Sequence, residues 1–248
     1  MTRDTSPTTE GVVQPLPEEL ASATSSTTAL DLSDTQITDA ALEVLQGLVG
    51  LQSLNLSSTE VTDRGLENLK GLTALRQLAI GFTQMTDQGI EHLKGLTSLQ
   101  SLDLIGNRIT GAGFAYLKGL TSLEWLNLPL TEITGRGLEH LKGLTSLESI
   151  VLYSTQVTDA GLEHLAGFTA LKRLDLSETN ISDSGLKNLK SLTGLEILDL
   201  SSTQISDAGL EHLKGLTNLQ VLLVGDTKIT DAGRAALKSA LPNVEIKD

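Results

Sequence analysis

The chain has 248 residues, of which 18 are basic and 31 acidic, so its formal net charge is −13. Hydrophobic residues make up 39% of it but aromatic residues only 2%, and fifty residues are leucine, about twice the ordinary usage. The acidity disfavours nucleic acid and anionic membranes as partners, because both attract Lys and Arg, and the lack of Cys excludes disulfides and thiolate metal sites.

The N-terminal part of the chain differs from the rest in composition. Residues 1–14 are rich in Thr, Ser and Pro and are expected to form a disordered tail. Residues 15–26 are predicted to form an N-terminal cap, with a short helix that uses Leu16 and Leu20. No segment has the apolar core of a signal peptide or the roughly 18 apolar residues of a membrane span. A cytoplasmic location is expected, and a fragment of a larger protein stays open as the alternative.

A period of 24 residues governs the chain from 27 to 241, which accommodates nine units. One unit runs from Leu51 to Leu72, and its pattern LxxLxLxxT recurs in the others with few changes. The segment 242–248 is predicted to add a C-terminal cap strand. One core position of the period is occupied by Leu30, Leu54, Leu78, Leu102, Leu126, Ile150, Leu174, Leu198 and Leu222.

Each unit predicts a strand, a loop, a short helix and a turn. Residues 54–56 alternate apolar, polar and apolar, the pattern of a half-buried strand. Leucines at positions 66, 69 and 72 form one apolar helical stripe. Strand and helix are apolar on one side only, so the units must stack to bury their leucines.

Polar residues at fixed positions predict the local contacts of each unit. Thr62 is a candidate helix N-cap, and Asp63 follows where the helix dipole favours negative charge. Gly71 fits a left-handed C-cap. Thr59 belongs to a column of hydroxyls, interrupted by Asn107, whose side chains are expected to bond to the backbone of the neighbouring coil.

The stacked units must curve. Neighbouring strands lie about 4.8 Å apart, whereas packed helices need about 8–10 Å. The predicted fold is therefore of the α/β class: a right-handed horseshoe-like solenoid with a parallel sheet of about nine strands on the concave face and short helices on the convex face.

This register resembles the leucine-rich repeat family over most of the chain, and LxxLxLxxT is closest to its ribonuclease-inhibitor-like and GALA-type bacterial forms. The resemblance implies a soluble bacterial protein that binds other proteins. It also suggests an alternative, a substrate-recruiting adaptor or effector like the F-box-linked ubiquitin-ligase components of the GALA-like group. No F-box-like segment precedes the first repeat, so that alternative requires the chain to be a fragment.

No residue pattern predicts catalysis, a cofactor or a metal site. The four histidines occupy one outward helix position in different units, too far apart to share a zinc ion, and are interpreted as solvated. No nucleophile or His converges on a carboxylate pair. We therefore expect a non-enzymatic protein, monomeric, that binds neither nucleic acid nor membrane. The histidines are His92, His140, His164 and His212.

The six aromatic residues all lie between Phe82 and Phe168. Phe114 and Phe168 replace core leucines, and Tyr116 points outward from a helix. The others map to the concave face or its edge, where Trp and Tyr are typical anchors of an interface. The predicted protein-binding surface comprises Phe82, Ile105, Trp125, Pro129, Leu130, Val151 and Tyr153. The alternative is that Trp125 and Tyr153 lie flat on the sheet and bind nothing.

A secondary surface is predicted towards the C-terminus. Asp175 and Asp199 are adjacent across the sheet, where like charges are unfavourable unless something offsets them. They form either an acidic strip for a basic partner, a cation site, or an ordinary repeat position whose repulsion Arg173 softens. The apolar side chains that extend this surface are Ile197, Val221 and Leu223.

Overall fold

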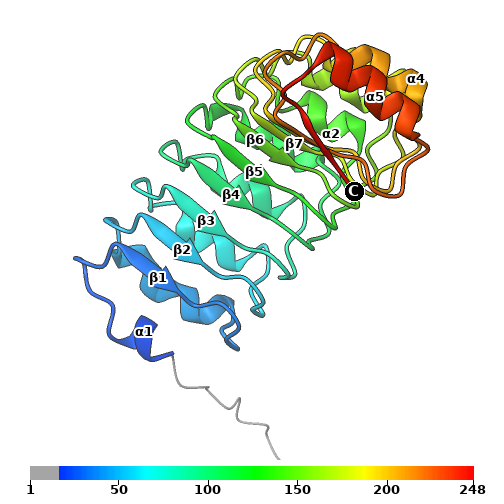
Figure 1. Cartoon of the computed structure of the whole chain (residues 1–248). Helices are drawn as coiled ribbons and strands as arrows, with labels where there is room; N and C mark the ends of the chain where they lie inside the picture. The colour runs from blue at the N-terminus through cyan, green and yellow to red at the C-terminus, as the bar shows by residue number, and fades with distance from the viewer. Residues whose placement is uncertain (1–16) are drawn as a thin grey trace, which may run out of the picture.

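The computed structural model describes residues 17–248, which stack into one open arc (Figure 1). The tail predicted at 1–14 and Leu16 of the predicted cap lie outside the described residues. Ten parallel strands form a single sheet, and each strand pairs with the next along the chain. The strands are β1 Ala29–Asp31, β2 Ser53–Asn55, β3 Gln77–Ala79, β4 Ser101–Asp103, β5 Trp125–Asn127, β6 Ser149–Val151, β7 Arg173–Asp175, β8 Ile197–Asp199, β9 Val221–Leu223 and β10 Glu245–Lys247.

The return path of each unit carries a short helix on the other side of the arc (Figure 1). Most of these are 3-10 helices, which suits leucines spaced by three residues because that helix has 3.0 residues per turn. The α-helices are α1 Glu18–Ala21, α2 Gly135–Glu139, α3 Asp183–Leu186, α4 Asp207–Leu210 and α5 Asp231–Ala240. The 3-10 helices are η1 Asp39–Gly47, η2 Gly65–Leu69, η3 Gly89–Leu93, η4 Ala112–Gly119, η5 Gly161–Leu165, η6 Lys187–Leu189 and η7 Glu211–Leu213.

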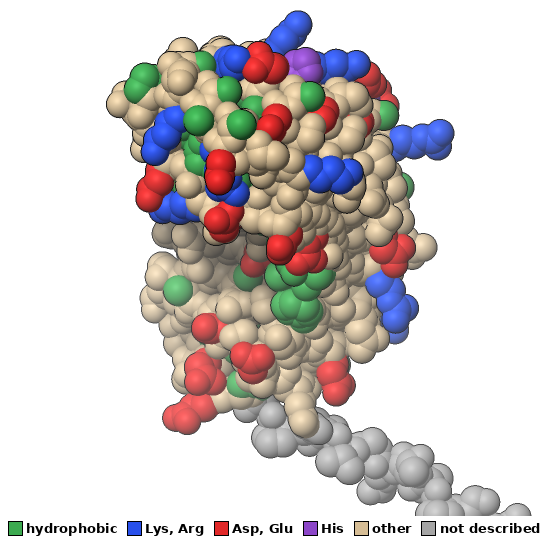
Figure 2. Space-filling model, turned by 45° about the vertical axis from the view of Figure 1, so that its right-hand side comes forward, with side chains coloured by type: hydrophobic (Ala, Val, Ile, Leu, Met, Phe, Trp, Pro, Cys, Tyr) green, Lys and Arg blue, Asp and Glu red, His purple; other side chains and the backbone are tan. Residues whose placement is uncertain are grey.

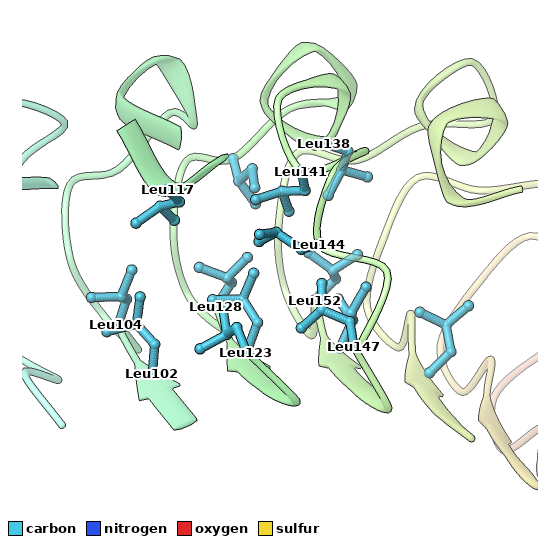
Figure 3. Packing of buried hydrophobic residues seen from close by; sticks show 14 of the residues in the cluster. Leu102, Leu104, Leu117, Leu123, Leu128, Leu138, Leu141, Leu144, Leu147 and Leu152 are labelled. Carbon is cyan, nitrogen blue, oxygen red and sulfur yellow. The ribbon is translucent and has the colours of Figure 1, made fainter. Parts of the chain in front are cut away.

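The core is a continuous column of leucines between sheet and helices. In Figure 3, Leu102 and Leu104 rise from the strand side of one coil, and Leu117 points down to them from its helix. Phe114 and Phe168 are buried among these leucines, which confirms that they replace core residues. At the N-terminal end Leu20 of α1 is buried against this column. Stacking therefore buries both one-sided faces, as the pattern predicts.

Each strand is followed by a turn that contains one left-handed residue, four positions after the central strand residue. Residues with φ between 51° and 69° occupy this position in every unit: Asp34, Ser58, Phe82, Gly106, Leu130, Ser154, Glu178, Ser202 and Asp226. Gly71 is not left-handed, so the predicted C-cap is wrong. The short helix ends instead on a further i→i+3 bond, from the Leu72 N–H to the Leu69 carbonyl (2.9 Å).

The hydroxyl column bonds within its own coil, which corrects a second expectation. The Thr59 hydroxyl donates to the Leu56 carbonyl at 2.7 Å, and the equivalent threonines do the same. Asn107 spans two coils, because its amide reaches one bond farther: it donates to the Ile80 carbonyl at 2.7 Å and accepts the Thr83 hydroxyl at 2.9 Å. The turn is thus satisfied locally by Thr.

The aspartate at each helix start joins two coils. Thr62 donates its N–H and its hydroxyl to the Asp39 carboxylate at 2.8 and 2.7 Å. We call this arrangement the aspartate staple. It recurs in Asp63–Thr86, Asp87–Thr110, Asp159–Ser182, Asp183–Ser206 and Asp207–Thr230. A hydroxyl that was predicted as a helix cap therefore acts mainly as a donor to the preceding coil.

The aspartate staple is missing in the middle of the arc, where Gly111 and Gly135 replace the aspartate. A side chain at Gly111 would collide with the backbone of Gly137, and a Cβ at Gly135 would lie 2.5 Å from the Gly161 Cα. Direct approach of the two backbones replaces the carboxylate bridge here. The coil of Gly111 also carries the exposed Tyr116, and the coil of Gly135 carries the exposed Trp125 and Leu130.

Candidate functional site

The side chains that flank the central residue of each strand point away from the core, and together they form the concave sheet face. Trp125 opens β5 on this face, with Ser101 and Ser149 as its register partners. Because both neighbours are small, 53% of Trp125 is exposed. The indole therefore presents about half of its surface to solvent on the concave sheet face.

Beside Trp125 the floor has a hollow of about 270 Å³. Its polar edge is held by Asp103, whose carboxylate accepts from the Asn127 amide (2.9 Å) and from the Ile105 N–H (3.0 Å). These hydrogen bonds hold the polar edge of the hollow in place and leave the Trp125 indole uncovered. Exposed and half-buried side chains that line the hollow include Ser101, Asp103, Trp125, Asn127, Val151 and Arg173.

A second apolar group lies at the turns that follow the strands. Phe82 and Leu130 are 52% and 44% exposed and occupy the left-handed turn position with φ of 51° and 55°. Bulky residues are rare there, because a left-handed conformation costs them roughly 1–2 kcal/mol. Other units use Ser, Asp, Glu or Gly at this position. The turn itself therefore does not require a bulky side chain at this position.

The ring of Phe82 lies across Gly106 in the next coil, where a Cβ would strike it. Ile105 is half-buried and adjoins Gly81, and Tyr153 is half-buried two coils farther on. The adjoining Glu178 carboxylate, together with burial, raises the pKa of the Tyr153 phenol. We call Phe82, Ile105, Leu130 and Tyr153 the apolar rim.

The predicted surface thus forms two groups rather than one. Trp125 and Val151 lie on the strands, whereas the apolar rim lies at the strand ends; Tyr153 is four residues beyond the register partner of Trp125, about 13 Å along the strand direction. Pro129 is buried, which corrects its assignment to the contact surface; its carbonyl accepts the Gly106 N–H at 2.9 Å. Figure 2 shows hydrophobic side chains gathered on one face with acidic side chains beside them.

The secondary surface has the geometry expected from the register. Asp175 pairs with Asp199, and all five residues of the secondary surface are partly exposed. Asp175 accepts the Ser177 N–H (3.0 Å) and hydroxyl (2.6 Å), and Asp199 accepts the Ser201 N–H (2.9 Å). Within residues 17–248 no third His, Asp or Glu joins such a pair to form a metal-binding group. Ile197 pairs with Val221, and Leu223 lies beside Asp199.

The histidines differ more than the sequence suggests. His140 and His212 are exposed, as expected. His92 and His164 are partly buried, with only 15% of the His164 side chain exposed, so solvation does not describe them. The His92 Nδ1 atom is buried and has no hydrogen-bond partner among the described residues.

Comparisons with known proteins agree with this architecture. A family model described as Leucine Rich repeat matches residues 28–45, 51–70, 95–117, 169–190 and 192–214. An internalin of Listeria monocytogenes (InlC2) is similar at 30% identity with a TM-score of 0.66, over 82% of this chain and 80% of that chain. A second internalin of that species (InlF) is similar at 24% identity with a TM-score of 0.62, over 87% of this chain and 72% of that chain.

A search of curated protein sequences finds no significant match. In the part of the chain that the structure describes, every helix is too short or too polar to cross a bilayer.

Proposed function

The chain belongs to the leucine-rich repeat proteins, and we propose that it is a non-enzymatic scaffold that binds a protein or peptide on its concave sheet face. The family and the internalin-like architecture support a role in protein interaction. The concave site, its residues and its partner are our proposal. The expected monomeric state and cytoplasmic location stay predictions.

One observation carries the proposal: the most exposed apolar side chains of the central coils are Phe82, Trp125 and Leu130, at positions where the repeat needs no apolar residue. An exposed Trp is a typical binding anchor, and neighbouring exposed apolar side chains typically mark contact sites. Phe82 and Leu130 also adopt a strained backbone conformation that other units give to small or polar residues. Strain at positions where the turn requires no bulky side chain favours a functional role.

To test this proposal, the native chain, a concave variant and a control variant are each immobilised and exposed to a lysate of the source organism. The concave variant carries Phe82→Ser, Trp125→Ser and Leu130→Ser, since Ser occupies these positions in other units. The control carries Tyr116→His, which removes an exposed aromatic from the helix side and restores the residue found at His92. We expect proteins that bind the native chain and the control to be absent from the concave variant. Identical sets of proteins from all three would rule out the concave site.

The concave variant is informative only if it folds. Because Trp125 is half exposed, we expect Trp125→Ser to change the free energy of unfolding by less than about 1 kcal/mol. Its neighbour Leu126 is buried, so Leu126→Ala should cost about 2–5 kcal/mol. Urea denaturation followed by circular dichroism measures both. A large loss for Trp125→Ser would mean that the indole belongs to the core.

The adaptor or effector alternative stays a prediction, because no feature of the described residues favours recruitment to ubiquitin machinery over simple binding.

A further inference from the structure

The apolar rim ends at an acidic surface. Tyr153 is followed in the next coil by Asp175 on β7 and by Glu178 in the turn, and Asp199 lies beside Asp175 on β8. All three carboxylates are at least partly exposed on the concave sheet face or its edge. A partner that covers the apolar rim therefore meets three negative charges at one end of it.

The turn does not require these charges. Asp175 and Asp199 accept the backbone N–H two residues ahead, but Asn55 accepts the Ser57 N–H in the same way at 3.0 Å. An uncharged amide therefore satisfies the turn equally well. Keeping two carboxylates side by side in register costs electrostatic energy that Asn would avoid.

Within residues 17–248, no basic side chain forms an ion pair with the carboxylates of the acidic surface. Lys172 is nearby, but its ammonium group forms an ion pair with Glu148 at 2.8 Å. Arg173 is exposed on the same face of β7. Among the described residues, Asp175, Glu178 and Asp199 form no ion pair within 4.0 Å. Their field extends to the apolar rim, where Glu178, burial and Asp175 together raise the pKa of Tyr153.

We propose that the segment bound on the concave sheet face is both apolar and basic: apolar side chains contact Trp125 and the apolar rim, and adjoining Lys or Arg side chains lie against Asp175, Glu178 and Asp199. This inference rests on the proposed function and names the chemistry of its partner. Charge complementarity selects a cationic polypeptide over a neutral or acidic one, because an acidic segment would face like charges without compensation. Exposed charges at the edge of an interface act mainly on the specificity of binding and on the association rate.

The test starts from an unbiased library of displayed random peptides, selected on the full chain. The selected peptides are synthesised and titrated against the protein, and the emission of Trp125, which is the single Trp of the chain, reports their binding. The charge variant carries Asp175→Asn, Glu178→Gln and Asp199→Asn, which keep the turn acceptors and remove three charges. The concave variant described above serves as the second arm, read by immobilised-peptide binding because it lacks Trp.

We expect the selected pool to contain more Lys and Arg than the starting library, next to apolar residues. Binding should weaken about tenfold in the charge variant, which corresponds to about 1.4 kcal/mol shared by the three removed charges. Binding to the native chain should also weaken as salt is raised, because salt screens exposed charges. If the selected peptides are neutral or acidic but their binding still requires Phe82, Trp125 and Leu130, this inference is overturned and the proposed function stands. Peptides that bind all variants equally, or a selection that yields no binders, would overturn both.

Discussion

At the scale of single residues, the most informative contact joins Asp63 to Thr86. The carboxylate accepts the Thr86 N–H at 2.7 Å and its hydroxyl at 2.6 Å, across 23 residues of chain. Hydrogen bonds to a charged acceptor are stronger than neutral ones, and this one satisfies two donors at once. The carboxylate therefore holds consecutive coils together on the side away from the sheet.

We predict that Asp63→Ala lowers the free energy of unfolding by about 1.5–3 kcal/mol, because two partly buried donors lose their acceptor. Asp231 is the matched control: it occupies the same position in the last unit, and no bond to its side chain is seen among residues 17–248. Asp231→Ala should cost only the helix-dipole contribution, about 0.5 kcal/mol. Equal losses in urea denaturation would show that the helix dipole and not the staple stabilises the coil.

Column-by-column comparison of the repeats could have detected the close approach of the coils. Gly recurs 26 residues after the helix-start position whether that position holds Asp, as in Asp39 and Gly65, or Gly, as in Gly111 and Gly137, and a Cβ has no room there. Likewise, Ser, Asp and Gly dominate the column that adopts positive φ, a composition typical of left-handed turn residues. Phe82 and Leu130 then stand out as exceptions.

At the scale of elements, the central coils differ from their neighbours on both faces. Gly111 has φ of 94° and lies against Gly137, and Trp125 opens the strand of the next coil, whose helix starts at Gly135. On the helix side close backbone contact replaces the carboxylate bridge, and on the sheet side exposed apolar residues replace polar ones. Both departures meet in the coil that carries Trp125, Leu130 and Gly135, whereas Phe82 lies in a coil that keeps its aspartate staple through Asp87.

Two glycine substitutions distinguish a glycine that close contact between coils requires from one that it does not. Gly111→Ala should lower the free energy of unfolding by at least about 1–3 kcal/mol, because Ala is strained at this φ and its Cβ collides with the next coil. Gly71→Ala should raise it by about 0.4–1 kcal/mol, since nothing lies within 4 Å and the unfolded chain loses entropy. Thermal or urea denaturation measures both. A stabilised Gly111→Ala protein would contradict the close approach of these coils.

At the scale of the whole molecule, hydrogen-bonded carboxylates link stability to pH. Hydrogen bonds from the Ser33 side chain and backbone hold the pKa of Asp31 below its ordinary 3.8. Burial alone would raise the pKa of Asp159, but hydrogen bonds from Ser182 and Ser184 lower it overall. The Thr230 backbone and hydroxyl lower the pKa of Asp207. The folded chain therefore binds fewer protons at acidic pH than the unfolded chain.

A lowered carboxylate pKa stabilises the fold at pH values above the unfolded pKa, and this stability is lost as the pH falls through the folded pKa. We predict that the free energy of unfolding is nearly constant from about pH 7 to pH 5 and falls from about pH 4 downwards. Urea denaturation at several pH values measures this, with Asp159→Asn as a variant whose dependence should be weaker. Stability that rises below about pH 4 would show that relief of the −13 charge dominates instead.

The sequence by itself determined the fold, because a leucine pattern that repeats every 24 residues leaves stacking as the only way to bury one-sided strands and helices. It also placed Phe114 and Phe168 in the core and put Asp175 beside Asp199. Only the tertiary structure decided which side chains meet between coils and which stay exposed: it joined Asp63 to Thr86, buried Pro129 and separated Trp125 from Tyr153. The physical reason is that hydrophobic periodicity is written along the chain, whereas contacts between coils and left-handed turns depend on distances that only the stacked arc defines.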